Sequence, residues 1–261
     1  MEALQNAPQV IRKVFLAPDL RDGELSTLLT KYKIPTHTIT PGRGSELVGK
    51  DSVHQGVIAT MNPASLLISL DNFLATLPPL QSSLPASGSP TGSPKIAVAI
   101  LGEVQDPHNV GAIIRSAAAF GLAGVLIPEH NQAGVTGAVV KASAGMVFRI
   151  PLVSIGNVNA TLKTLKEKGF WIYGLAMDGK TALGTETFDA PAAFIVGNES
   201  GGIRGKTLEA CDITLKIPMH PRTESLNASV SAALVFYEWA HKHLAAAWPK
   251  PAPTRRRPEA L

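Results

Sequence analysis

The chain has 261 residues, a net charge of +4 and one cysteine, and 45% of its residues are hydrophobic. This length suffices for one or two domains with a large core, whereas one cysteine excludes an internal disulfide framework and favours a reducing cytoplasm. No run approaches the roughly 18 apolar residues of a membrane span. The mild positive charge fits an RNA partner without requiring one, and Cys211, which lies just before an expected strand, should pack rather than react.

The first eighty residues alternate between apolar runs and amphipathic segments, which predicts a small α/β layer. We expect strands at residues 10–16, 34–39 and 54–60, and helices at 23–32 and 65–77. Residues 81–94 then consist mostly of Ser, Pro and Gly, a composition typical of a flexible linker. We therefore place domains at 1–80 and 95–247, the linker at 81–94, and a basic, disordered tail at 248–261.

The second domain is expected to alternate strands and helices to its end. Residues 96–101 form an apolar run, as in a parallel strand buried on both faces. Further strands are expected at 124–127, 146–150, 170–176, 193–197 and 213–217, and helices at 109–120, 136–144, 157–168 and 206–210. A long last helix should start near a cap at Thr223 or Ser225. The pattern predicts a doubly wound or related parallel sheet.

Three polar stretches follow strands of this expected sheet, at residues 109–115, 196–203 and 217–231. Ligands of open α/β sheets bind at the carboxyl ends of the strands. The stretches supply the candidate site residues Asn109, Arg115, Gly197, Asn198, Glu199, Ser225 and Asn227. Each also has an ordinary alternative, because an asparagine can simply cap a helix, an arginine can face solvent, and a glycine run can form a turn.

Residues 174–181 match the phosphate-loop pattern G-x-x-x-x-G-K-S/T. Such a loop must open a helix that points its N–H groups at the phosphates. Gly184, Thr185 and Pro191 make a helix unfavourable here, so a nucleotide hydrolase remains only the less favoured alternative. The first strand of the second domain is also not followed by the G-x-G-x-x-G pattern of an ordinary Rossmann site.

The stretches 109–117, 195–203 and 217–230 resemble the three ordered motifs of the SpoU-type RNA 2′-O-ribose methyltransferases, in the SPOUT class. The resemblance covers residues 95–247. Residues 54–59 and the layer before them resemble the substrate-binding domain of these enzymes, whose fold is like ribosomal protein L30e. Together they point to the branch that methylates a guanosine of 23S rRNA. Pro221 and Ala228 depart from the usual Gly and Val.

The resemblance implies a deep trefoil knot, a homodimer and an RNA substrate. S-adenosylmethionine would be held mainly by backbone groups, at Leu175, Ala176, Gly197, Ile217 and Leu226. The same resemblance gives the role of base to Arg115, with Asn109, Glu199, Ser225 and Asn227 orienting it and the ribose. A guanidinium is normally always protonated, so Arg115 could instead bind the adjacent phosphate and stabilise the developing alkoxide. No metal is expected. A tRNA 2′-O-methyltransferase and an rRNA-binding or antibiotic-resistance factor of the same fold stay open as alternatives.

Overall fold

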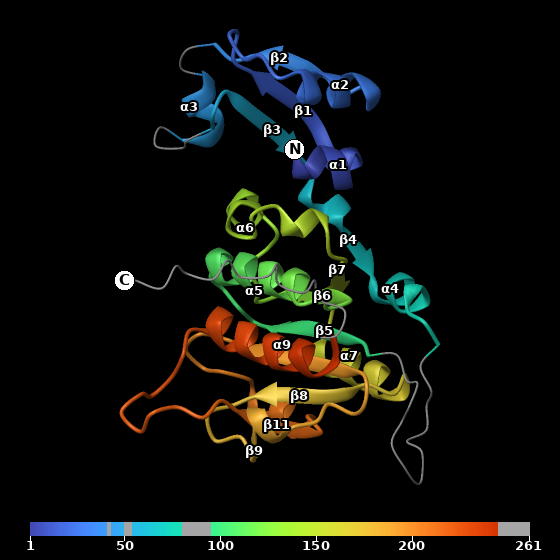
Figure 1. Ribbon diagram of the computed structural model, residues 1–261, viewed down its shortest axis with the longest axis vertical. Coiled ribbons are helices and arrows are strands. Elements are labelled where there is room, and N and C mark those ends of the chain that lie inside the picture. Colours follow the sequence, from blue (N-terminus) through green and yellow to red (C-terminus); the bar gives the residue numbers. More distant parts are fainter. Residues whose placement is uncertain (41–42, 50–53, 80–94, 245–261) are drawn as a thin grey trace, which may run out of the picture.

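The computed structural model describes residues 1–40, 43–49, 54–79 and 95–244, so the expected linker and basic tail lie outside the described residues. The described chain contains a three-stranded and an eight-stranded sheet. The small sheet and its helices lie at one end of an elongated molecule (Figure 1). None of the described helices is long and apolar enough to cross a membrane.

The three-stranded sheet has β1 (Ile11–Leu16) at its centre, parallel to β2 (Thr36–Thr38) and antiparallel to β3 (Val57–Met61). The helix α2 (Gly23–Lys31) follows β1, and the side chain of Asp22 accepts a hydrogen bond from the N–H of Leu25 at its start. These elements confirm the expected α/β layer, with shorter bounds. Two further helices, α1 (Glu2–Asn6) and α3 (Arg43–Val48), were not predicted.

The eight-stranded sheet has the order β4-β7-β6-β5-β10-β8-β11-β9, and all its pairs are parallel. Its strands are β4 (Leu67–Ser69), β5 (Ala97–Gly102), β6 (Gly124–Pro128), β7 (Leu152–Ile155), β8 (Trp171–Leu175), β9 (Thr181–Ala182), β10 (Ala192–Gly197) and β11 (Ile213–Lys216). The parallel α/β class is therefore confirmed.

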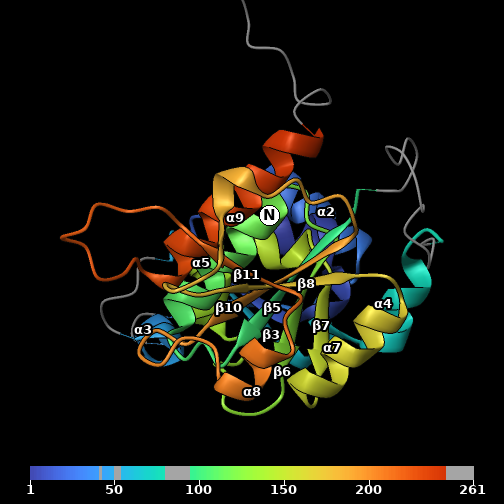
Figure 2. The same ribbon diagram turned by 90° about the horizontal axis from the view of Figure 1, so that it is seen from below.

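Helices cover both faces of this sheet. One face packs against α5 (Pro107–Ala119), α6 (Gly137–Ala142) and α9 (Ala228–Leu244), and the other against α4 (Leu70–Thr76), α7 (Val158–Glu167) and α8 (Gly205–Glu209) (Figure 2). Because successive strand residues point to opposite faces, Ala99 and Leu101 of β5 belong to the first core and Val98 and Ile100 to the second. Burial on both faces explains the continuous apolar run.

Two predicted elements were wrong. The strand expected at 146–150 is a 3₁₀ turn, η3 (Met146–Phe148), and β7 follows it. One helix was expected at 65–77. The structure has three elements there: the end of a 3₁₀ turn, η2 (Pro63–Leu66), the edge strand β4 of the larger sheet, and the helix α4. The division of the chain at 81–94 stays a prediction, but β4 already pairs with β7 in the larger sheet, and Phe73 of α4 lies in one of its cores. An ion pair joins α1 to the end of η3, because Arg149 donates from Nη2 to Oε1 of Glu2 over 2.9 Å.

The segment with the phosphate-loop pattern does not have that loop's structure. Thr181 begins the short strand β9, and a 3₁₀ turn, η4 (Leu183–Thr185), follows it. A Cβ atom on Gly179 would lie 2.5 Å from the backbone carbon of Leu215, so this glycine serves a close approach between two chain segments. The sequence predicted that no α-helix would start after this pattern, and the strand β9 and the turn η4 confirm it.

Candidate active site

A pocket of about 750 Å³ lies at the carboxyl ends of β8, β10 and β11. Its volume is in the range of small-molecule sites. All five residues that the resemblance assigned to the cofactor line it, namely Leu175, Ala176, Gly197, Ile217 and Leu226. Glu199, Ser225 and Asn227 line it as well. Met177, Asp178 and Met219 also belong to the lining, and no pattern in the sequence distinguished them from ordinary loop residues.

The loop after β10 forms one wall of this pocket, and its residues 199–202 are exposed. Asn198 and Gly202 exchange two backbone hydrogen bonds of 2.9 and 3.0 Å, and the side chain of Asn198 accepts from the N–H groups of Ser200 and Gly201. A Cβ atom on Gly197 would lie 2.4 Å from the carbonyl carbon of Gly202. Only glycine therefore allows the loop to close back against the end of its strand.

Three side chains from the three polar stretches form one hydrogen-bonded network. The amide of Asn109 donates to Oε1 of Glu199 over 3.0 Å, and the amide of Asn227 donates to Oδ1 of Asn109 over 2.9 Å. Glu199 also accepts from the backbone N–H groups of Gln105 and Asp106, each over 3.3 Å. The carboxylate thus ties the loop before α5 to the wall of the pocket, and Asn109, 6% exposed, is the central member.

The structure corrects the start of both helices in this network. Asp106 caps α5 by accepting from the N–H of His108, so Asn109 lies within the first turn rather than at the cap. Asn227, not Thr223 or Ser225, caps α9, because its Oδ1 accepts from the N–H groups of Ser229 and Val230 over 2.9 and 3.3 Å. Its amide nitrogen remains directed to Asn109, so one side chain starts a helix and joins the network.

Burial raises the pKa of Glu199, but the hydrogen bonds from Asn109 and from backbone N–H groups outweigh burial and hold this pKa below its ordinary value of 4.5. A carboxylate with a depressed pKa stabilises the fold above its ordinary pKa, and this contribution is lost as the pH falls through the folded value.

Glu199→Gln should therefore lower the free energy of unfolding at pH 7, and the difference from the wild type should shrink below about pH 4.5. Urea unfolding at several pH values measures this, with Glu209→Gln on the exposed surface of α8 as a control that should follow the wild type.

Arg115 is the one candidate that the structure does not bring to the pocket. It is exposed on α5, is not among the described residues that line the pocket, and makes no hydrogen bond or ion pair within the described part of the chain. The other ten predicted residues either line the pocket or, in the case of Asn109, bond directly to its wall.

Comparison with known proteins identifies the class. Residues 97–237 match the sequence model of the SpoU rRNA methylase family, and residues 1–67 match that of the RNA 2′-O ribose methyltransferase substrate-binding domain. The chain is 32% identical over 243 residues to the 23S rRNA (guanosine-2′-O-)-methyltransferase RlmB of Nitrosomonas europaea, covering 92% of this chain and 87% of that protein. It is 34% identical over 237 residues to RlmB of Photobacterium profundum, covering 90% and 91%.

Solved structures share the fold. The SpoU methyltransferase AviRb from Streptomyces viridochromogenes, in complex with the cofactor AdoMet, superposes with a TM-score of 0.72 at 21% identity over 94% of this chain and 87% of that one. An AdoMet-bound rRNA methyltransferase from Sinorhizobium meliloti gives 0.73 at 20% identity over 94% and 85%. The fold is thus that of the SpoU methyltransferases. The chain belongs to the SpoU rRNA methylase family.

Proposed function

We propose that this enzyme transfers the methyl group of S-adenosylmethionine to the 2′-oxygen of a guanosine in 23S rRNA, in the cytoplasm. The pocket beside the Asn109–Glu199–Asn227 network is the observation that carries this function, because it joins a cavity of cofactor size to polar groups that can orient a ribose. The names of the relatives in Nitrosomonas and Photobacterium support 23S rRNA and guanosine as the substrate.

The cofactor would lie against the backbone of the three loops that line the pocket, at Leu175 and Ala176, at Gly197, and at Ile217 and Leu226. We propose that these loops are threaded as a deep trefoil knot. Two features support this threading. β10 lies between β5 and the earlier strand β8, and the segment after β11 passes the Gly197 loop before it reaches α9. The cofactor would supply an electrophilic methyl group, and the protein's own residues would position the ribose and help its 2′-hydroxyl to lose a proton.

Methyl transfer requires the ribose 2′-oxygen to lie in line with the methyl group and to lose its proton. Positioning of this kind can contribute several kcal/mol. In our proposal, Asn109, Glu199, Ser225 and Asn227 orient the ribose and the loop before α5. Arg115 either accepts the proton of the 2′-hydroxyl or, as a guanidinium, binds the neighbouring phosphate while the proton leaves to water. A forked guanidinium is well suited to the phosphate.

We propose that two subunits pair through α5 and α9, so that Arg115 reaches the pocket of the partner. The two helices run side by side in the same direction, since Asn109 contacts Asn227 near their starts and Phe120 contacts Tyr237 further along. Val230, Leu234 and Tyr237 form an exposed apolar stripe on α9, with 46%, 40% and 43% of their surfaces accessible. An apolar stripe of this kind on a soluble protein is typical of an interface.

Leu234→Glu should convert the dimer to a monomer, because it places a charge in the centre of the proposed interface. The rate of methyl transfer should fall when the dimer is lost, whereas the monomer should stay folded. Sedimentation measures the mass. Leu47→Glu is the matched control, because Leu47 is also 40% exposed but lies on α3 at the other end of the molecule. A wild type that sediments as a monomer, or a Leu234→Glu variant that remains dimeric, would contradict the interface.

We propose that the N-terminal layer is an L30e-like domain that binds the rRNA. Its match to the substrate-binding family over residues 1–67 and its small mixed sheet with flanking helices support this role.

The function is tested by calorimetry and by mapping of ribose methylation. We expect S-adenosylmethionine to bind and ATP to be left unhydrolysed. A 23S rRNA transcript should gain a methyl group at one guanosine, whereas a tRNA transcript should gain none. Methylation of the tRNA alone would establish the tRNA alternative, and cofactor binding with no methylation of either RNA would favour a non-catalytic RNA-binding factor. ATP turnover that disappears in Lys180→Ala would favour the nucleotide hydrolase.

A further inference from the structure

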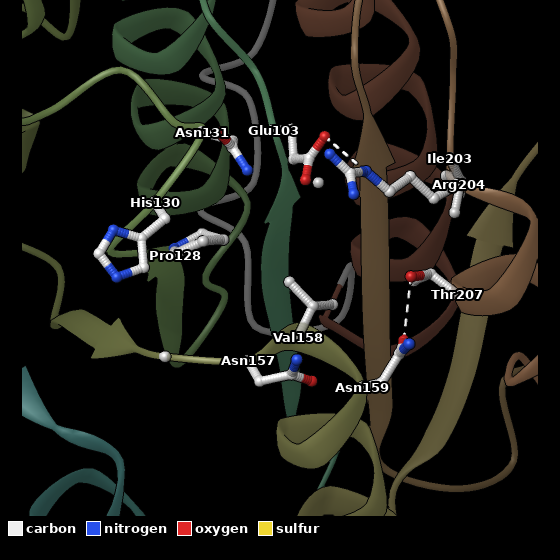
Figure 3. A pocket seen from close by; sticks show the side chains of 12 residues that line it. Glu103, Pro128, His130, Asn131, Asn157, Val158, Asn159, Ile203, Arg204 and Thr207 are labelled. Atoms are coloured by element: carbon white, nitrogen blue, oxygen red, sulfur yellow. Dashed lines mark hydrogen bonds and ion pairs between the residues drawn. The ribbon is translucent and has the colours of Figure 1, made fainter.

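A second cavity, of about 460 Å³, lies at the carboxyl ends of β5, β6 and β7. The chain from Asn198 to Arg204 separates it from the cofactor pocket, and Ile203 lines both. The apolar side chains of Pro128, Val158 and Ile203 line one part of the cavity, and polar side chains stand around it (Figure 3).

The polar residues of this second cavity have unused hydrogen-bonding groups. Arg204 donates from Nε to Oε2 of Glu103 over 2.8 Å, and within the described residues no hydrogen bond occupies the other carboxylate oxygen or the guanidinium Nη groups. The side chain of Asn131 makes no hydrogen bond within the described part of the chain and points toward Glu103 (Figure 3). A carboxylate, a guanidinium and an amide therefore face one cavity with free acceptors and donors.

The backbone holds these groups in place at a conformational cost. Glu103 and Asn131 both have left-handed backbone angles, with φ of 67° and 55°. Asparagine tolerates this region, but glutamate rarely adopts it. The carbonyl group of Glu103 accepts a hydrogen bond of 2.8 Å from the amide of Asn198, in the loop that forms the wall of the cofactor pocket. Strain of this kind is typical of ligand sites.

We propose that this cavity binds a guanine base of the RNA substrate, an inference that rests on the proposed function. Flipped-out or single-stranded bases are recognised by stacking on flat apolar surfaces and by hydrogen bonds to their edges. Pro128, Val158 and Ile203 provide the surface. The carboxylate of Glu103 accepts from the N1–H and N2–H groups of guanine, and Arg204 or Asn131 donates to the adjacent O6.

The other bases fit this arrangement less well. Adenine places an acceptor, N1, beside its amino group, and cytosine places the acceptor N3 beside its own, so each would set a lone pair against the carboxylate. Uracil offers one N–H between two acceptors. Guanine alone offers two neighbouring donors next to an acceptor, which matches a carboxylate next to cationic and amide donors.

The proposal is tested on the full chain saturated with S-adenosylhomocysteine, which occupies the cofactor pocket and prevents nucleotides from binding there. Titration with 5′-GMP, 5′-IMP, 5′-AMP and 5′-UMP, followed by saturation-transfer NMR, should show GMP binding about tenfold or more tightly than AMP or UMP. IMP, which lacks the N2 amino group, should be intermediate. Glu103→Gln should weaken GMP binding about tenfold, and Arg204→Gln severalfold.

Lys166→Gln is the matched control, because it breaks an exposed ion pair, with Asp212, that lies outside the lining of this cavity. It should leave GMP binding unchanged. If Glu103→Gln lowers the melting temperature, Asn131→Asp replaces it, since Asp also tolerates the left-handed backbone and should repel O6. Equal binding of the four nucleotides, or GMP binding that these variants leave unchanged, would overturn the base site. S-adenosylhomocysteine binding without a preference for GMP would reject this inference alone, whereas failure of S-adenosylhomocysteine to bind would reject the proposed function with it.

Discussion

Arg115→Ala should lower kcat for RNA methylation about 100-fold or more, an effect comparable to the removal of a donor that stabilises a developing oxyanion. The melting temperature and the affinity for S-adenosylmethionine should stay near those of the wild type. Arg115 is exposed on α5, makes no hydrogen bond or ion pair within the described residues and does not line the pocket at the ends of β8, β10 and β11, so its removal leaves core and pocket intact. A loss confined to kcat indicates an interaction made in the transition state.

Arg115→Lys should also be poor, because an ammonium group cannot reproduce the planar, forked donors of arginine. Lys163→Ala, which removes an exposed cation from α7 on the other face of the sheet, is the matched control and should stay active. If Arg115 acts on the pocket of the partner, mixing Arg115→Ala subunits with Gly197→Ala subunits should restore part of the activity. Near-normal turnover of Arg115→Ala would instead show that Arg115 is an ordinary surface residue.

Gly197→Ala should abolish cofactor binding and lower the free energy of unfolding by about 1–3 kcal/mol, the usual cost of overpacking. The added methyl group would lie 2.4 Å from the carbonyl carbon of Gly202 and 2.6 Å from the backbone nitrogen of Ile203. Backbone atoms cannot move aside as a flexible side chain can, so the loop that forms the pocket wall must shift. Calorimetry with S-adenosylmethionine and urea unfolding measure the two effects.

Gly201→Ala provides the matched control for this substitution. Gly201 lies in the same loop and lines the same pocket, but a Cβ atom there would meet nothing within 4 Å. Its cofactor affinity should remain within about twofold of the wild type, because the added methyl group displaces no atom of the loop, and substitutions that create no clash change stability little. Equal losses in the two variants would mean that the loop tolerates no side chain at all, and the close approach at Gly197 would then not explain the effect.

The local sequence was sufficient to predict the strands and helices that are fully buried. The run at 96–101 is apolar throughout because β5 is covered on both faces, and the stripe of α5 faces a single core. The meeting of the three polar stretches at one edge of the sheet was predictable because each follows a strand, and the strands of a parallel sheet end at the same edge. The residue order within these stretches was also enough to indicate membership of the SpoU family.

Only the tertiary structure decided the features that depend on contacts between residues far apart in the chain, such as strand pairing and side-chain hydrogen bonds. Leu67 and Ile68 become the strand β4 only because β7 offers an edge to pair with, and the residues before Pro151 form a turn although they are as apolar as a strand. Asn109 is hydrogen-bonded to Glu199 and Asn227, which lie 90 and 118 positions further along the chain. No local sequence pattern predicts contacts over such separations. Asn and Ser cap helices about equally well and Thr somewhat less well, so the local sequence does not decide the cap. The hydrogen bond to Asn109 favours Asn227 as the cap of α9, and Ser225 lies in the pocket wall.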